Sequence, residues 1–482
     1  MSNSESDTRL DRAIKFYAFE KRHELFAFTR SGFSSWRVMR NLVFQMHQQN
    51  APTIGNVPRL IRLFIAAAAI AKLVFILVLP PKADWIFKGC VSALRWRVGS
   101  QWLDPALDPL LDQGYKAFKI IEVNSSFFRD QAKNAAYPND LEPSAFTLLG
   151  RVLGLLLPVD IADFDVRTAN LISQELNVDV APSVLRFRVS TVVWQARLYG
   201  LLLRRIMPKN VIVTDTGEYG LRLACLHLGI PFYEVQHGVF DSLHPDAIPE
   251  EASGNDQELL IPDILLAKGQ FWIDQLAGYR NGRVAVPVGS AIIDYWRKFG
   301  KGHERGPEVH IVITTQGVAV PQIIEQLRSI IAAAPKGLNW RMSLKLHPVY
   351  DKIENYRKAF LSDGRVTILE GSSDPNIYEL LATSDLHLSI SSACHFDALA
   401  LDVPSLMLPL PTHENLLYAV DAGGLVLVTS PVDVWTALQT DGPRPDSKYF
   451  CQPEYVINVR NCLDRSRTKT RAVHSANSLH VS

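Results

Sequence analysis

The fold is decided by residues 211–238, which read VIVTDTGEYGLRLACLHLGIPFYEVQHG. The apolar run 211–214 has the length and β-branched composition of a buried strand. A polar turn leads from it into a helical pattern over 219–228, which Gly229 is placed to cap. Residues 230–235 form the next apolar run, so the stretch predicts a right-handed βαβ unit with parallel strands.

The same alternation of strands and helices extends on both sides of this unit. Predicted strands and helices before the polar linker at 298–308 are strands 117–123, 264–267 and 284–288 and helices 186–205 and 270–276. Those after it are strands 310–315, 343–348, 366–369, 386–390 and 405–409 and helices 320–333, 376–382 and 395–401. The predicted class is therefore α/β, with two tandem Rossmann-like domains. We place them at 110–297 and 309–440, between a helical segment at 1–100 and a C-terminal helix with a disordered tail at 441–482.

Composition and charge exclude several classes of protein. Of the 482 residues, 47% are hydrophobic and 21% are charged, which excludes a disordered chain, a collagen-like fibre and a coiled-coil rod. The net charge of +1 gives no overall field for nucleic acid, and none is expected as a partner. The five cysteines are widely spaced without a CxxC pair, which indicates a reducing cytoplasm.

The N-terminal segment suggests contact with a membrane. Residues 1–100 carry a net charge of +9, whereas the remainder carries −8. The apolar stretch 63–79 has 17 residues with Lys72 near its middle, which is short for a membrane span. A spanning helix, a helix lying in the membrane interface and a buried core helix all stay open. We expect a cytoplasmic protein, peripheral to the inner membrane or anchored in it.

In the first predicted domain, two groups of polar residues follow strands. Gln236, His237 and Gly238 end the strand at 230–235, where a histidine can act as a general base or simply bond to a loop. Asp215 and Glu218 follow the strand at 211–214, where they can bind acceptor hydroxyls, supply a base or cap the next helix.

The second predicted domain has matching groups. Lys345 and His347 lie two positions apart near a strand end, so they share one side and can both donate to phosphate oxygens. Ser391 and Ser392 open a helix, where hydroxyl and backbone N–H groups can bind an anion or cap the helix. Asp397 on that helix can reach a ribose or lie on the surface.

Several common motifs are missing from the sequence. There is no P-loop, no G-x-G-x-x-G fingerprint, no H-E-x-x-H and no G-x-S-x-G elbow. The D-x-D at 163–165 follows no convincing strand, so we interpret it as a loop or helix cap. We therefore predict no metal site and no cofactor.

The order and spacing of these motifs resemble bacterial GT-B glycosyltransferases of surface-polysaccharide synthesis. Capsule Kdo transferases, bacterial sialyltransferases and CDP-glycerol glycerophosphotransferases belong to this neighbourhood. The resemblance rests on Gln236-His237-Gly238, Lys345-Leu346-His347-Pro348, and Ser391-Ser392 through Asp397, with the inter-domain region around Gly289-Ser290. It covers about residues 205–415. Asp397 stands where a glutamate is common, and Cys394 and His395 are unusual, which leaves the nucleotide open.

The resemblance implies transfer of a sugar or glycerophosphate from a nucleotide-activated donor to a growing, lipid-linked glycan of capsule or lipopolysaccharide type. His237 is then the base of an inverting reaction. Lys345, His347, Ser391 and Ser392 hold the donor phosphate in place of a metal. Two alternatives stay open: a nucleotide-sugar epimerase of related two-domain fold, and a non-catalytic, membrane-associated assembly protein.

Overall fold

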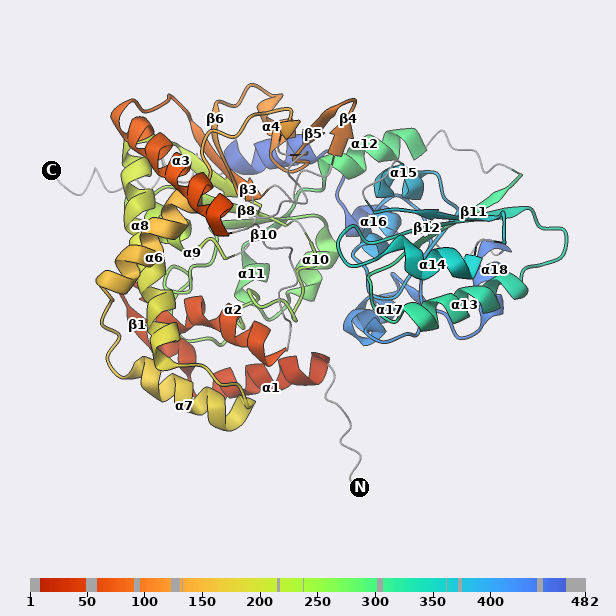
Figure 1. The fold of residues 1–482 in the computed structure, drawn as a ribbon, viewed down its shortest axis with the longest axis horizontal. Coiled ribbons are helices and arrows are strands. Elements are labelled where there is room, and N and C mark those ends of the chain that lie inside the picture. Colours follow the sequence, from red (N-terminus) through yellow and green to blue (C-terminus); the bar gives the residue numbers. More distant parts are fainter. Residues whose placement is uncertain are drawn as a thin grey trace. The chain divides into compact units, whose positions relative to one another are not determined.

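The computed structural model divides the chain into two compact units (Figure 1). The first comprises Met1–Ala267, Trp272–Val286 and Val459–Ser482, and the second Lys268–Phe271 and Pro287–Asn458. Each unit contains a six-stranded sheet of parallel strands, which confirms the predicted α/β class with two Rossmann-like domains. The structure describes residues 9–48, 59–90, 96–122, 131, 133–214, 217–236, 238–300, 307–360, 362–371, 375–439 and 445–464.

The first sheet has the order β6-β3-β7-β8-β9-β10. Its strands are β3 (Trp85–Cys90), β6 (Ala117–Glu122), β7 (Asn210–Val213), β8 (Phe232–Val235), β9 (Ile264–Ala267) and β10 (Ala285–Pro287). The chain builds outward from β3 in one direction to β6 and then in the other from β7 onward. The strand order therefore reverses between β3 and β7, and ligands of open parallel sheets bind outside the carboxyl ends at such a switch point.

Strand β3 is the central element that the sequence interpretation missed. It pairs with both β6 and β7, although it precedes residue 110, so the first sheet begins earlier in the chain than predicted. Its sequence, WIFKGC, has Lys88 and Gly89 inside an otherwise apolar run. A Cβ at Gly89 would lie 2.8 Å from Thr214 Oγ1, so glycine permits the close approach of the neighbouring strand end.

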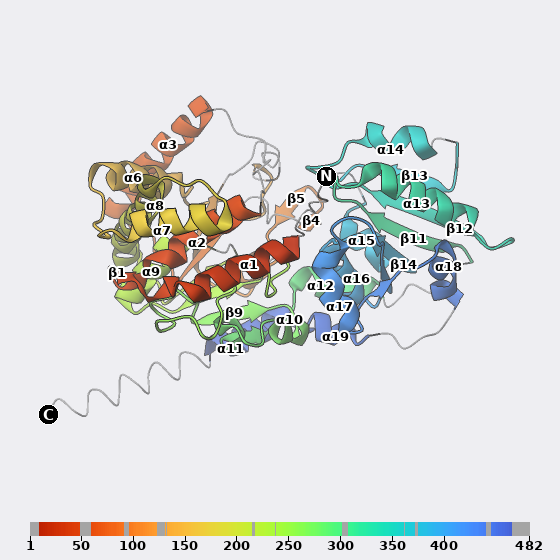
Figure 2. The same cartoon turned by 90° about the horizontal axis from the view of Figure 1, so that it is seen from below.

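Helices cover both faces of the first sheet (Figures 1 and 2). α3, α6 and α8 pack side by side, and α8 also packs on α9. The helices are α1 (Arg9–Arg22), α2 (Ser35–His47), α3 (Arg59–Val78), α4 (Asp108–Leu111), α6 (Ser144–Leu156), α7 (Phe164–Leu176), α8 (Pro182–Ile206), α9 (Tyr219–Leu228), α10 (Gln270–Gln275) and α11 (Arg280–Arg283). Short pieces complete the unit: the pairs β1 (Thr29–Arg30) with β2 (Phe33–Ser34) and β4 (Trp96–Val98) with β5 (Gln101–Leu103), and the 3-10 turn η1 (Leu25–Ala27).

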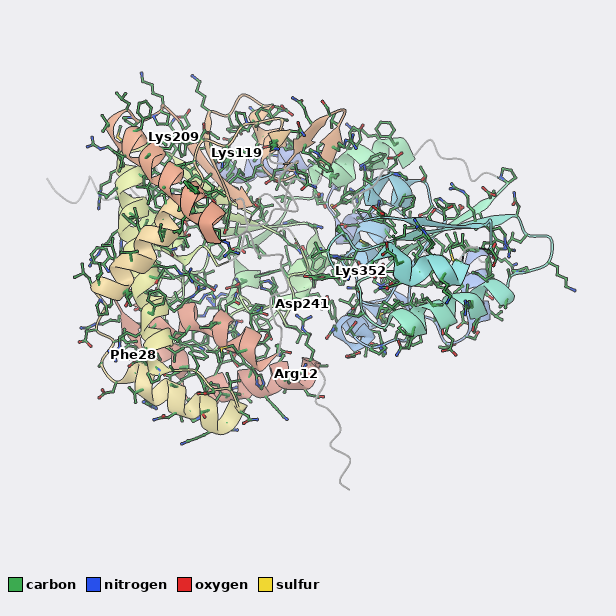
Figure 3. The ribbon with its side chains drawn as sticks, viewed as in Figure 1. Arg12, Phe28, Lys119, Lys209, Asp241 and Lys352 are labelled. Carbon is green, nitrogen blue, oxygen red and sulfur yellow. The ribbon has the colours of Figure 1, made fainter. Side chains whose placement is uncertain are left out.

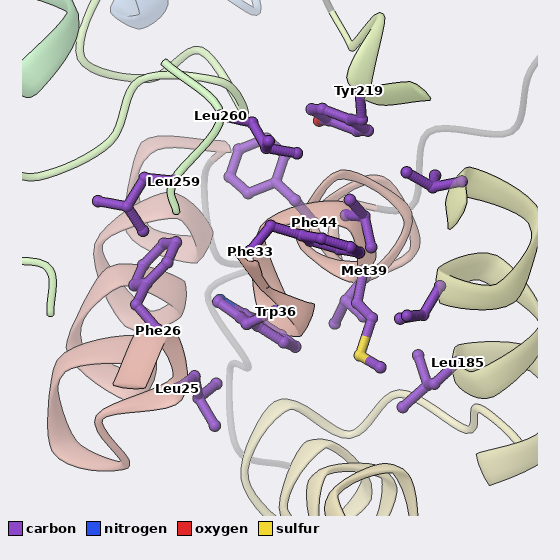
Figure 4. Packing of buried hydrophobic residues seen from close by; sticks show 14 of the residues in the cluster. Leu25, Phe26, Phe33, Trp36, Met39, Phe44, Leu185, Tyr219, Leu259 and Leu260 are labelled. Atoms are coloured by element: carbon purple, nitrogen blue, oxygen red, sulfur yellow. The ribbon is translucent and has the colours of Figure 1, made fainter. Parts of the chain in front are cut away.

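The N-terminal helices α1 and α2 are part of the first unit's core. Trp36 and Phe44 are buried together with Leu185 of α8 and Leu260 (Figure 4). Phe28, which Figure 3 labels, stacks on Phe164 of α7 with ring centroids 4.3 Å apart. This part of residues 1–100 is thus held by packing against residues far along the chain.

Helix α3 has one buried and one exposed apolar face. Ala69, Leu73 and Ile76 are buried in a core cluster with β3, β6 and β7. The opposite face is apolar yet exposed; its large side chains are Leu63, Phe64, Val74, Phe75 and Val78. Lys72 Nζ donates to the Asn139 carbonyl at 3.4 Å. Within the part of the chain that the structure describes, no helix has the length and apolar character needed to cross a membrane.

The second sheet has the order β13-β12-β11-β14-β15-β16, which reverses between β11 and β14. Its strands are β11 (Val309–Thr314), β12 (Trp340–Lys345), β13 (Val366–Leu369), β14 (Leu386–Ser389), β15 (Ser405–Met407) and β16 (Val426–Leu427). Helices and turns of this unit are α12 (Ala291–Gly300), α13 (Val320–Ala332), α14 (Ile353–Phe360), α15 (Ile377–Ala382), α16 (Cys394–Ala400), η4 (His413–Leu416), α17 (Leu417–Asp421), α18 (Pro431–Gln439) and α19 (Ser447–Phe450). β12 ends at Lys345, three residues before the predicted strand end, so His347 lies in the loop that follows.

Candidate functional site

The switch point of the first sheet holds a buried ion pair. Lys88 near the end of β3 contacts Glu218, which immediately precedes α9, through Nζ and Oε1. The Lys88 side chain is 2% exposed and the Glu218 side chain 17%. A lysine this deeply buried needs a carboxylate partner, because an isolated charge loses its hydration. Glu218 therefore neutralises the buried charge of Lys88, in addition to preceding the first residue of α9.

A cavity of about 280 Å³ opens beside this pair. Its lining residues come from the ends of β3 and β6, from α6 and α8, and from the turn that leads into α9. Its lining is more polar than apolar and includes Lys88, Glu122, Pro143, Thr147, Arg151, Arg188, Thr191, Val192, Gln195, Tyr199, Gly217, Glu218, Tyr219 and Gly220. A concave polar site at a topological switch point is the expected place for a ligand.

Tyr219 in the cavity wall is held in position by the buried charged residues Asp246 and Arg37. Its hydroxyl donates to Asp246 Oδ1 at 2.7 Å, and Arg37 Nη1 reaches the same carboxylate oxygen at 2.7 Å. Burial raises the pKa of the Tyr219 hydroxyl, and it would raise that of Asp246 as well. The nearby Arg37 charge reverses this for Asp246, whose pKa is lowered overall. The wall is thus held by an ionised carboxylate.

Two of the predicted catalytic residues, Asp215 and His237, lie outside the described residues. Their neighbours are placed as expected at strand ends. Gln236 follows β8, extends the ladder by donating its backbone N–H to the Leu266 carbonyl at 3.0 Å, and reaches the Gly238 carbonyl at 2.9 Å through Nε2. An added Cβ at Gly238 would meet nothing within 4 Å, so the surrounding atoms leave room for a side chain at this position.

A second buried carboxylate lies close to the same switch point. Asp104 Oδ1 accepts the backbone N–H groups of Ala106 and Leu107, at 2.8 and 3.3 Å. Its Oδ2 has no hydrogen-bond partner among the described residues and would lie 3.2 Å from a Cβ at Gly89. Burial, and next the charge of Asp108, raise the pKa of Asp104 to about 7. Asp108 itself is ion-paired with Lys119, which Figure 3 labels.

In the second sheet, His347 lies in the loop after β12, the strand next to β11, and is oriented by that loop. Its Nδ1 accepts the backbone N–H groups of Val349 at 3.1 Å and Tyr350 at 3.3 Å. An acceptor nitrogen carries no proton, so the proton of the neutral ring is on Nε2. The Tyr350 ring stacks on the imidazole with centroids 4.4 Å apart. His347 Nε2 is therefore a positioned N–H donor in the loop beyond β12.

Ser391 lies beyond the end of β14, one strand from β11. Its backbone N–H and its hydroxyl both lie within hydrogen-bond distance of Gln316 Oε1, at 3.1 and 3.3 Å. The hydroxyl also contacts Thr412 Oγ1 at 2.7 Å. Ser392 Oγ accepts the backbone N–H of Cys394 at 3.2 Å, which is a helix-capping bond. Ser391 thus lies at the β11/β14 switch point, while Ser392 binds the first residue of α16.

Lys345 and Asp397 are engaged in other contacts. Lys345 is 4% exposed, and its Nζ donates to the carbonyls of Glu370 at 2.8 Å and Pro375 at 3.0 Å. It therefore ties down the loop after β13. Asp397 Oδ1 pairs with Lys268 Nζ at 3.2 Å. Both predicted ligand-binding residues have a structural partner already.

Gly289 and Ser290, the predicted inter-domain residues, precede α12. Gly289 has φ +97°, and a Cβ there would lie 1.9 Å from the Gln452 carbonyl oxygen, so only glycine fits. The Ser290 carbonyl accepts the backbone N–H of Asp294 at 3.0 Å. These contacts give both residues a structural role in the second unit.

The unusual His395 is a core residue. Its Nδ1 contacts Ser405 Oγ at 2.7 Å, and the same hydroxyl contacts His387 Nδ1 at 2.7 Å. His387 Nε2 reaches Thr314 Oγ1 at 2.9 Å. Burial lowers the pKa of His395 to about 4, so the ring is neutral at physiological pH. This chain of polar contacts links β11, β14, β15 and α16 behind the serine pair.

The sequence interpretation missed most of the first cavity. Arg151, Arg188, Gln195 and Glu122 are spread over three elements, and nothing in their local spacing connects them. One signal was present: Lys88 is a charge inside an apolar strand, which indicates a buried partner.

Comparisons with known proteins found similarity to solved structures only, and at low sequence identity. No family model and no curated protein matches. The UDP-GlcNAc 2-epimerase from Neisseria meningitidis bound to UDP-GlcNAc is 14% identical, covering 79% of this chain and 100% of that one, at a TM-score of 0.48. MurG from Acinetobacter baumannii is 12% identical, covering 80% and 100%, at 0.47. The wall teichoic acid polymerase TagF is 9% identical, covering 86% and 99%, at 0.40. Similarity at this level decides no activity.

Proposed function

We propose that this chain is a GT-B-type glycosyltransferase that binds a nucleotide-activated donor at the switch point of its second sheet. The observation that carries the proposal is the orientation of His347. Two backbone N–H groups occupy its Nδ1, so the ring presents Nε2–H as a donor. Ser391 supplies a hydroxyl beyond the end of β14, which is separated from β12 by β11 alone. Fixed N–H and O–H donors of this kind stabilise the charge that develops on a departing phosphate.

The acceptor side of the proposed reaction belongs to the first sheet. His237 is the proposed general base of an inverting transfer, with Asp215 nearby in sequence. Glu218 is the proposed contact to acceptor hydroxyls, oriented by its ion pair with Lys88. An inverting transfer needs a base on the acceptor and charge stabilisation on the donor phosphate, which matches this division of roles.

The exposed apolar face of α3 favours a transferase with a membrane-bound acceptor over an epimerase that acts on a soluble sugar nucleotide. Phe64 and Phe75 are 76% and 61% exposed on that face. Large exposed apolar side chains in a row are typical of a surface that binds a partner or a lipid. We propose that this face inserts into the membrane interface and holds the enzyme beside a lipid-linked glycan.

A thermal-shift panel with CMP, CDP, UDP and GDP tests the donor site. One nucleotide is expected to raise the melting temperature of the wild type, because a ligand that binds only the folded state stabilises it. His347→Ala is expected to lose most of that shift. His227→Ala removes an exposed histidine from the first unit and is expected to keep it. If no nucleotide shifts the wild type at millimolar concentration, the transferase proposal fails.

A further inference from the structure

We infer that the cavity beside Lys88 and Glu218 binds an anionic sugar residue. The cavity would recognise both the negative charge and the hydroxyl groups of this sugar. The inference rests on the proposed function, because it names the chemical class of the acceptor whose hydroxyl would be glycosylated. It draws on residues that the sequence motifs did not include.

The size and polarity of the cavity fit a single sugar ring. Its volume of about 280 Å³ is just below the range for drug-sized ligands, roughly 300–1,000 Å³, as a smaller ligand requires. The wall presents hydroxyl groups from Thr147, Thr191 and Tyr199. Thr191 is 8% exposed, and its Oγ1 has no hydrogen-bond partner among the described residues. A buried hydroxyl without a partner is costly, so a polar ligand at this wall would satisfy it.

The charges around the cavity select for an anion. Lys88 and Glu218 compensate each other in their ion pair. Among the described residues of the lining, the other charged ones are Arg151, Arg188 and Glu122, whose formal charges sum to +1. Arg188, another lining residue, uses Nε to donate to the Val38 carbonyl at 3.3 Å, which orients its guanidinium. Arginine is well suited to carboxylate and phosphate oxygens because its planar fork donates two parallel hydrogen bonds.

Glycines shape the wall between α6, α8 and α9. A Cβ at Gly150 would lie 2.7 Å from Gln195 Cγ, and one at Gly220 would lie 2.7 Å from Gln195 Cβ. The two glycines therefore let the Gln195 side chain of α8 sit between α6 and α9. The amide of Gln195 adds a donor and an acceptor to the lining, as hydroxyl recognition requires.

Isothermal titration calorimetry on the full chain tests this assignment with three probes: D-glucuronate, D-glucose 6-phosphate and D-glucose. At least one anionic sugar is expected to bind about tenfold tighter than glucose, and the better of the two identifies carboxylate or phosphate as the anionic group. Arg151→Gln is expected to weaken that binding by about tenfold. Arg205→Gln, which removes an exposed arginine of α8 outside the cavity, is expected to leave it unchanged.

Three results would overturn the inference: glucose binding as tightly as the anionic sugars, no sugar binding at millimolar concentration, or unaltered binding by Arg151→Gln. Nucleotide titrations on the same proteins separate the two proposals. If Arg151→Gln binds nucleotide like the wild type, a lost sugar signal concerns this cavity alone. If the wild type binds an anionic sugar but no nucleotide, the cavity assignment stands as a binding site while the donor proposal fails.

Discussion

At the scale of single residues, Asp351 organises the loop that carries His347. Its Oδ2 accepts from Thr315 Oγ1 at 2.6 Å, from the Gly317 backbone N–H at 3.0 Å and from the His347 backbone N–H at 2.9 Å. Its Oδ1 accepts the Tyr356 hydroxyl at 2.7 Å. One carboxylate thus joins the loops after β11 and β12, which adjoin the proposed donor site.

Asp351→Ala is expected to lower the free energy of unfolding by roughly 2–4 kcal/mol, because four donors lose a charged acceptor. It is also expected to weaken nucleotide binding. Urea denaturation and the thermal-shift panel measure the two effects. The control, Asp363→Ala, removes a surface ion pair with Arg365 and should cost less than about 1 kcal/mol. An equal loss in both variants would argue against the organising role of Asp351.

The carboxyl of Asp104 gives the first unit a specific pH dependence. Its pKa is about 7 in the folded chain against an ordinary value of 3.8, so the folded state holds a proton that the unfolded state has lost between these values. Stability from this group therefore falls as pH rises from about 4 to about 7, and is level above that. Asp104→Asn removes the titration while keeping an acceptor for Ala106 N–H.

Chemical denaturation at pH 5 and pH 8 measures this difference. Asp104→Asn is expected to be more stable than the wild type at pH 8, by about 1–4 kcal/mol, and the two proteins should converge at lower pH. A gap between the two proteins that is the same at both pH values would show that Asp104 does not titrate in this range.

At the scale of elements, the crossing of α6 and α8 depends on small residues. A Cβ at Gly154 would lie 3.0 Å from the Thr191 backbone nitrogen and 3.2 Å from the Ser190 backbone carbon. Backbone atoms cannot move aside as a flexible side chain can. This close approach brings Thr147 and Arg151 of α6 to the same cavity as Thr191 and Gln195 of α8.

Gly154→Ala is expected to destabilise the chain by about 1–3 kcal/mol through overpacking, although alanine is the better helix former. Gly200→Ala in α8 is the matched control, since the nearest atom to its Cβ is Arg204 Nη1 at 3.9 Å. That control should be stabilising by up to about 1 kcal/mol. Urea titrations of both variants check the opposite signs; two stabilised variants would contradict the tight crossing.

Helix α3 is the element that we connect with the membrane. Phe64→Ser with Phe75→Ser is expected to reduce binding to anionic lipid vesicles by at least about tenfold, because burying one Phe contributes roughly 1.5–3 kcal/mol. Co-sedimentation measures the bound fraction. Phe299→Ser, which removes a phenylalanine that is 57% exposed in α12, should leave binding unchanged. Equal binding by all three proteins would show that the exposed face of α3 does not bind the membrane.

Most elements were predictable because their apolar periodicity is uninterrupted. The helix predicted over 219–228 is α9 to the residue, and the strands at 264–267 and 366–369 are β9 and β13. β3 was not predicted because Lys88 and Gly89 interrupt its apolar pattern. Both residues are required by partners distant in the chain: Glu218 pairs with Lys88, and Thr214 packs against Gly89. The nature of α3 was open for a similar reason: only tertiary packing shows which of its apolar faces is covered.

At the scale of the whole molecule, both units follow one rule. Each has a parallel sheet whose strand order reverses once, and each places polar side chains beyond that point. Of the residues predicted for the second domain, His347 and the serine pair lie in the loops beyond β12 and β14. The sequence located the first of these places only through Glu218, since the cavity is assembled from helices that are distant in the chain. It also gave Lys345 and Asp397 ligand roles, whereas both have structural partners.

The most direct test of the donor site is amide hydrogen–deuterium exchange of the full chain with and without the nucleotide that stabilises it most. We predict slower exchange in residues 346–351 and 389–394, which carry His347 and Ser391, and little change in α7, which lies away from both switch points. Unchanged exchange in those two segments at saturating nucleotide, or protection confined to the first unit, would contradict the central claim that the second sheet binds the donor.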